Sequence, residues 1–153
     1  MSNPGFFDLG ELLVTLFHLA IAYALALPIG WHQESSERTL GLRTFPLVSM
    51  ASAAYVFLGL AVFPADTEGQ SRLIQGLMTG IGFLGAGAIL KERGSVHGTA
   101  TAASVWATGA IGAAAAYGYL EIAVTVSAIT YGTLRWGTLI KQRIERQAEI
   151  EDE

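Results

Sequence analysis

Long intervals of this chain contain no charged residue, and this feature restricts the fold more than any other. They include positions 44–64, 73–90 and 99–120. About 20 apolar residues, at a rise of 1.5 Å each, cross a hydrocarbon layer of roughly 30 Å. With two further apolar stretches at the ends, the sequence predicts an all-α, polytopic membrane bundle of about five helices. Their expected bounds are 9–31, 44–63, 73–90, 99–117 and 120–140.

The composition agrees with a membrane environment. Hydrophobic residues make up 52% of the chain and charged residues 14%, whereas soluble domains carry roughly 25% charge. We expect one transmembrane domain over 1–140 and a short charged, helical cytoplasmic tail over 141–153. Positions 1–10 contain no Lys or Arg, so the first apolar stretch does not resemble a signal peptide and is expected to remain. The absence of cysteine excludes disulfides and thiolate chemistry.

The basic residues predict the orientation. If the N-terminus is outside, eight of the nine basic residues lie on the cytoplasmic side and only Arg72 lies outside. This distribution follows the positive-inside rule, so we expect an external N-terminus and a cytoplasmic C-terminus in a bacterial inner membrane. The net charge of -4 argues against nucleic acid as a partner.

The stretch from Gly80 to Gly85 spells G-x-G-x-x-G, which in another context marks a dinucleotide site. Here no buried strand precedes it and no acidic residue follows about 20 positions later, so the nucleotide interpretation is set aside. Small residues instead allow close packing of membrane helices. Because glycines occur on two sides of the third helix, we expect that helix at the centre of the bundle. The helix-packing candidates are Gly76, Gly80, Gly82, Gly85, Gly87, Gly109 and Gly112.

Some polar residues fall inside the apolar segments. Glu11 and His18 share one face of the first helix, and Thr108 continues a hydroxyl stripe with Thr101 and Ser104 on the fourth. Ionisable groups in a membrane are functional candidates. The alternatives are that Glu11 caps the helix start or lies in the headgroup layer, and that His18 donates to a carbonyl. The hydroxyls could likewise bond to their own helix or to a neighbouring one.

Residues at the cytoplasmic ends of the second, third and fourth helices form a candidate pocket for an ion or for a partner's side chain. We expect Arg43 to pair with Glu34 or Glu37. The alternative to a binding pocket is that Arg43 and the carboxylate form a purely structural ion pair, and that the positive charge anchors the protein at the membrane surface. The sequence does not identify a metal for this pocket. The pocket candidates are Glu34, Glu37, Arg38, Arg43, Thr44, Lys91, Thr99, Thr101 and Ser104.

Three motifs, GLRT from Gly41, GIGFLGAGAIL from Gly80 and TAASVWATGAIG from Thr101, resemble the membrane domain of the MgtC/SapB family in order and spacing. The resemblance implies a link to adaptation to low magnesium. Family members usually show Gly-x-Glu-Arg before the first loop, and this chain departs from that pattern after Gly30, so Glu34 or Glu37 is expected to replace the acid. The cytoplasmic domain of many relatives is not expected here.

We therefore expect a non-enzymatic membrane regulator of magnesium or ion homeostasis, without a cofactor. It is expected to form a homodimer and to touch another membrane protein such as a transporter or ATP synthase. The alternative is a small ion- or proton-conducting transporter or channel. An enzyme is the least favoured class, because the three histidines are scattered and no H-x-x-x-H or H-E-x-x-H spacing occurs.

Overall fold

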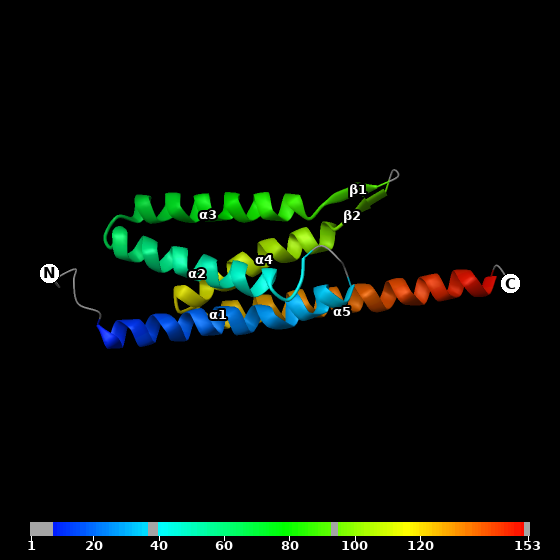
Figure 1. Cartoon of the computed structure of the whole chain (residues 1–153), viewed down its shortest axis with the longest axis horizontal. Helices are drawn as coiled ribbons and strands as arrows, with labels where there is room; N and C mark the ends of the chain where they lie inside the picture. Colours follow the sequence, from blue (N-terminus) through cyan, green and yellow to red (C-terminus); the bar gives the residue numbers. More distant parts are fainter. Residues whose placement is uncertain (1–7, 37–39, 93–94, 152–153) are drawn as a thin grey trace.

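The computed structural model describes residues 8–36, 40–92 and 95–151. It consists of helices and one short β-hairpin, so the predicted all-α class is confirmed with a small addition (Figure 1). In chain order the elements are α1 (Leu9–Ser36), α2 (Thr44–Val62), α3 (Thr67–Gly87), β1 (Leu90–Glu92), β2 (Ser95–His97), α4 (Thr99–Ala116) and α5 (Leu120–Glu151). In the described part of the chain, two helices, α1 and α2, are long and apolar enough to cross a membrane on length and composition.

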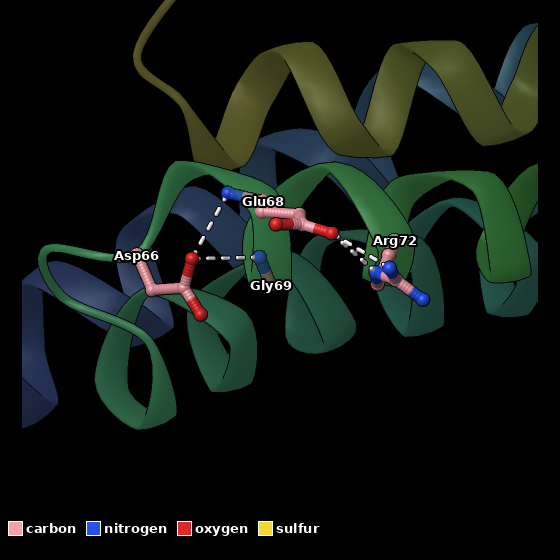
Figure 2. A network of polar contacts seen from close by, with 4 residues as sticks. All are labelled: Asp66, Glu68, Gly69 and Arg72. Carbon is pink, nitrogen blue, oxygen red and sulfur yellow. Dashed lines mark hydrogen bonds and ion pairs between the residues drawn. The ribbon is translucent and has the colours of Figure 1, made fainter.

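Helix α3 begins six residues earlier than hydropathy predicts, because its first turn is polar and capped. The Asp66 side chain accepts hydrogen bonds from the backbone N–H groups of Glu68 and Gly69, both at 3.0 Å (Figure 2). These two groups have no carbonyl partner within the helix, so the carboxylate satisfies them. One turn further on, Arg72 pairs with Glu68 at 2.6 Å on the exposed surface.

Helix α4, and not α3, lies at the centre of the bundle. α4 packs against α1, α2, α3 and α5, whereas α3 makes substantial contact only with α2 and α4. The expectation that α3 is central is therefore wrong. The physical reason lies in how the glycines are used: Gly109 and Gly112 of α4 are buried against neighbouring helices, while Gly76 and Gly80 of α3 are exposed.

Glycines bring α4 close to its neighbours on two sides. A Cβ on Gly112 would collide with the backbone carbonyl of Ser49 in α2, and a Cβ on Gly109 would collide with Ile81 in α3. On the facing side, a Cβ on Gly85 of α3 would lie 3.1 Å from the carbonyl oxygen of Ala102 in α4. By contrast, four glycines of α3 have nothing within 4 Å of such a Cβ. These are Gly76, Gly80, Gly82 and Gly87.

Helices α1 and α5 lie side by side, although they are the first and the last in the chain (Figure 1). The Ser127 hydroxyl of α5 donates to the Leu25 carbonyl of α1 at 2.6 Å. Nearer the C-terminal end of α1, His32 Nε2 and Thr138 Oγ1 are 3.2 Å apart. α5 then continues beyond the bundle toward the C-terminus.

The segment between α3 and α4, expected as a loop, contains an antiparallel hairpin in which Leu90 pairs with His97 and Glu92 with Ser95. The hairpin ends at Gly98, whose φ of 83° is strained for other residues. A Cβ there would also collide with the carbonyl of Ala88. Gly98 therefore fixes the point where the chain turns back into α4.

Candidate functional site

The candidate site lies where the C-terminal end of α1 meets the N-terminal ends of α2 and α4. Gln33 of α1 is 2% exposed and donates from Nε2 to Oγ1 of Thr101, which is fully buried at the start of α4. The hydrogen bond is 3.2 Å long and joins residues 68 positions apart. A buried amide is stable only with such partners, so this contact fixes α1 against α4.

A stripe of hydroxyls continues from Thr101 along α4. Ser104 donates to the Ala100 carbonyl and Thr108 donates to the Ser104 carbonyl, each at 2.7 Å. Both side chains are buried, and both bond to their own helix, which was the structural alternative for this stripe. The hydroxyls are thus satisfied without a ligand.

On the α2 side of the same interface, Ser52 donates to the Val48 carbonyl at 2.7 Å. Ser49 is fully buried, and its hydroxyl has no hydrogen-bond partner among the described residues. The burial of both residues beside α4 adds them to the polar interior of the bundle.

Glu34 holds the loop before α2. Its carboxylate oxygen accepts the backbone N–H of Leu42 at 2.9 Å, and its side chain occupies the space that a Cβ on Gly41 would need. Arg43 directly precedes α2 and is exposed. Glu34 is thus hydrogen-bonded to the loop backbone. Within residues 8–36, 40–92 and 95–151, no ion pair links it to Arg43. Glu37 and Arg38 lie outside the described residues.

The remaining candidates for the predicted pocket are dispersed along one end of the bundle. Lys91 is exposed in β1, Thr99 is exposed at the first position of α4, and Thr44 is half-buried at the first position of α2. The structure therefore brings together Gln33, Thr101 and the hydroxyl stripe, but it does not gather the charged candidates into one enclosed pocket.

The polar face of α1 lies at the opposite end. The Asp8 carboxylate accepts the Gly10 N–H at 2.8 Å at the start of the helix, and Glu11 is exposed. His18 Nδ1 is 2.8 Å from the Val14 carbonyl. Because a carbonyl only accepts, Nδ1 carries the proton in this contact. The ring also meets Phe57 of α2 edge-on, with the centroids 5.7 Å apart.

The buried polar residues of the described chain are all neutral. They are Gln33, Ser49, Ser52, Thr101, Ser104, Thr108 and Ser127. Over the same residues, no three His, Asp or Glu side chains gather in a way that could hold a metal ion.

Together, the helical bundle, its apolar exterior and the uncharged buried polar residues of the described chain define an all-α membrane protein. A model described as the MgtC family matches residues 19–143, and the chain belongs to this family. No solved structure gave a significant match.

Several relatives support the assignment. The chain is 34% identical over 149 residues to Protein SrpB of Synechococcus elongatus, which covers 86% of this chain and 79% of that protein. It is 33% identical over 114 residues to Protein MgtC of Salmonella typhimurium, covering 74% of this chain and 48% of the relative. Protein MgtC of Brucella abortus is 37% identical over 112 residues, with 71% and 45% covered. The chain thus spans about half the length of its MgtC relatives.

The Gly-x-Glu-Arg pattern, counted from Gly30, places His32 and Gln33 at the Glu and Arg positions. In the structure both side chains connect α1 to another helix, His32 to Thr138 and Gln33 to Thr101. Sequence reasoning did not single out Gln33. The sequence feature that could have identified Gln33 is its amide side chain, which lies three residues after Gly30 and before the charged loop.

Proposed function

We propose that this chain is a non-enzymatic, multi-pass inner-membrane regulator that contributes to adaptation to low magnesium through contact with another membrane protein. The observation that carries the proposal is the state of the buried polar groups. Gln33 and Thr101 bond to each other across helices, and Ser104 and Thr108 bond within α4. These contacts stabilise the bundle, and the charged side chains that the structure describes lie at the surface.

This arrangement favours a regulator over an ion or proton pathway. Ionisable residues in transmembrane segments usually mark ion routes and proton relays. The buried polar set in the described chain consists of amides and hydroxyls, which suit helix association better than stepwise proton transfer. The MgtC relatives link the proposal to magnesium through their name alone.

The proposal includes five membrane crossings with the N-terminus outside. α3 has 21 residues and α4 has 18, so at 1.5 Å per residue each reaches about 30 Å. α5 is longer than a crossing requires, with 32 residues. Arg43, Lys91 and Arg135 then lie toward the cytoplasm, as the positive-inside rule favours.

Self-association is also part of the proposal. The backbone of Gly76, Gly80, Gly82 and Gly87 is not covered by other parts of the described chain. In lipid, helices associate through small residues that allow close approach. A second copy approaching the outer side of α3 would cover these glycines.

The experiment combines ion flux with a growth assay. Purified protein in liposomes should show no Mg²⁺, K⁺ or proton flux above protein-free liposomes, whereas deletion of the gene should impair growth at low magnesium. Thr101→Val, which removes the hydroxyl that Gln33 bonds, should lower membrane abundance together with growth. Arg43→Lys preserves the charge and serves as the control. Selective flux would instead establish the transporter alternative.

A further inference from the structure

The turn that joins α4 to α5 lies further inside the bundle than the turn that joins α2 to α3 (Figure 1). The contact between Gly112 and Ser49 fixes α4 against α2, and both helices run in the same direction. α2 continues for 13 positions after Ser49, whereas α4 ends four positions after Gly112. At 1.5 Å per residue, α4 therefore ends roughly 13 Å before α2 does.

A second, independent contact gives the same offset between α1 and α5. The Ser127 hydroxyl of α5 donates to the Leu25 carbonyl of α1 at 2.6 Å, and these helices also run in the same direction. α1 begins 16 positions before Leu25, whereas α5 begins seven positions before Ser127. The start of α1 therefore extends roughly 13 Å beyond the start of α5. Residues 117–119 thus form the floor of a recess, whose walls are the protruding ends of α1, α2 and α3.

The α3 wall and the floor of the recess are polar. They border a cavity of about 400 Å³, in which Ile74 is the one lining residue without a polar side chain. The lining residues are Thr67, Gln70, Ser71, Ile74, Gln75 and Tyr117. Amides and hydroxyls bind water, and a cavity of this size holds several water molecules.

The α1 wall has a polar inner face and an apolar outer face. Thr15 and His18 are half-buried, and the His18 ring meets Phe57 of α2 edge-on. Leu13 and Phe17, two positions from Thr15 and hence on the other side of the helix, are each 60% exposed. Large exposed apolar side chains are favoured in lipid and disfavoured in water. The start of α1 therefore lies within the membrane, and the floor of the recess lies below the membrane surface.

The floor contains backbone groups that need water. Within the described residues, the carbonyls of Tyr117 and Gly118 accept no backbone hydrogen bond. Irregular backbone at membrane depth occurs where protein buries it or where it lines a water-filled cavity. Tyr117 and Tyr119 are 39% and 55% exposed, so the described chain does not bury this turn. Water is the partner that these carbonyls require.

We propose that the recess is a water-filled cavity, open at the end of the bundle where α1 begins, which hydrates the turn between α4 and α5 and admits small polar molecules. Its polar lining and the apolar outer face of α1 then each meet the solvent that suits them. The compartment that supplies the water rests on the orientation in the proposed function, which places this end outside. The presence of water does not depend on that orientation.

The test uses thiol labelling, because the chain has no cysteine and an introduced thiol is therefore unique. The full chain in lipid nanodiscs, in which both membrane surfaces are accessible, is treated with a membrane-impermeant maleimide. Thr15→Cys lies on the inner face of α1. Leu13→Cys is nearer the start of α1 but faces lipid, and it is the matched control. Thr15→Cys should react at least about tenfold faster, because the reactive thiolate is disfavoured in hydrocarbon.

Gln75→Cys tests the α3 wall, eight positions from the start of that helix, and should react as fast as Thr15→Cys. Circular dichroism checks that each variant is folded, and His18→Cys replaces Thr15→Cys if that variant is not. Equal rates for Leu13→Cys and the α1 wall variant overturn the proposal, since the helix end would then lie wholly in lipid or wholly in water. A rate for Gln75→Cys as low as that for Leu13→Cys also overturns it.

The same reagent added to spheroplasts identifies the compartment separately. It should label Gln75→Cys from outside. If Gln75→Cys reacts in nanodiscs but reacts in spheroplasts only after permeabilisation, the orientation in the proposed function is wrong and the cavity opens to the cytoplasm. Slow labelling in nanodiscs instead rejects the cavity and leaves both the topology and the regulatory role intact.

Discussion

Gly112 of α4 lies directly against the backbone carbonyl of Ser49 in α2, with no space for a Cβ between them. Both residues are buried. The backbones of the second and fourth helices therefore meet without an intervening side chain, and this contact sets the distance between α2 and the central helix. Small residues at helix contacts permit such an approach in lipid.

Gly112→Ala should destabilise the bundle by about 1–3 kcal/mol, the usual effect of overpacking a well-filled interior. Unfolding of the purified protein in detergent measures this change. Gly82→Ala adds the same methyl group where nothing lies within 4 Å, and it should not lower the unfolding midpoint, because alanine favours the helix more than glycine does. Equal effects of the two variants would contradict the close contact.

Gln33 and Thr101 should show a measurable coupling energy. In a double-mutant cycle with Gln33→Leu and Thr101→Val, the coupling should be about 0.6 kcal/mol, the average for hydrogen bonds between membrane helices. The free energy of unfolding in mixed micelles provides the measurement. Thr101 takes part in a further interaction. Thr101→Val alone should therefore lower the free energy of unfolding by more than the coupling energy. Strict additivity would indicate that the two side chains do not interact.

Gly80→Leu should weaken self-association without unfolding the monomer, because no part of the described chain lies within 4 Å of a Cβ at this position. Analytical ultracentrifugation in detergent reports the oligomeric state, and circular dichroism reports the helix content. Gly109→Leu, which would collide with Ile81 inside the chain, should instead lower helix content. An unchanged dimer in Gly80→Leu would exclude this face of α3 from the interface.

The orientation predicts that a tag before α1 is accessible from outside and that a tag after α5 is accessible only from the cytoplasm. The excess of basic residues on one side is the physical cause. Labelling of intact and permeabilised cells distinguishes the sides. An N-terminal tag labelled only after permeabilisation would show that the helix count or the orientation is wrong.

The uncharged intervals were sufficient to predict the helices of the middle of the chain, since α2 and α4 end within one residue of the expected bounds. Hydropathy did not predict the polar first turn of α3, because that turn is stabilised by the Asp66 cap. The hairpin was also missed. Its strands have only three residues each, too few for an alternating pattern to be recognised.

The position of each helix in the bundle was harder to predict than its existence. Gly112 allows the backbones of α4 and α2 to approach closely, whereas Gly80 leaves an open surface on α3. The sequence alone does not distinguish these two uses of glycine. Gln33 likewise precedes a charged loop, yet it is buried because α4 begins beside it. Such differences arise from contacts between residues that are far apart in the chain.

The pairing of α1 with α5 has a consequence for biosynthesis. The bonds from Ser127 to Leu25 and between Thr138 and His32 join residues separated by 102 and 106 positions. The first helix is therefore synthesised about 100 residues before the part of α5 that it contacts. Until the ribosome has passed Thr138, the surface of α1 that α5 will cover, including the Leu25 carbonyl, is open to lipid or to other proteins of the insertion machinery. The contact between α1 and α5 can therefore form only after α5 has been synthesised.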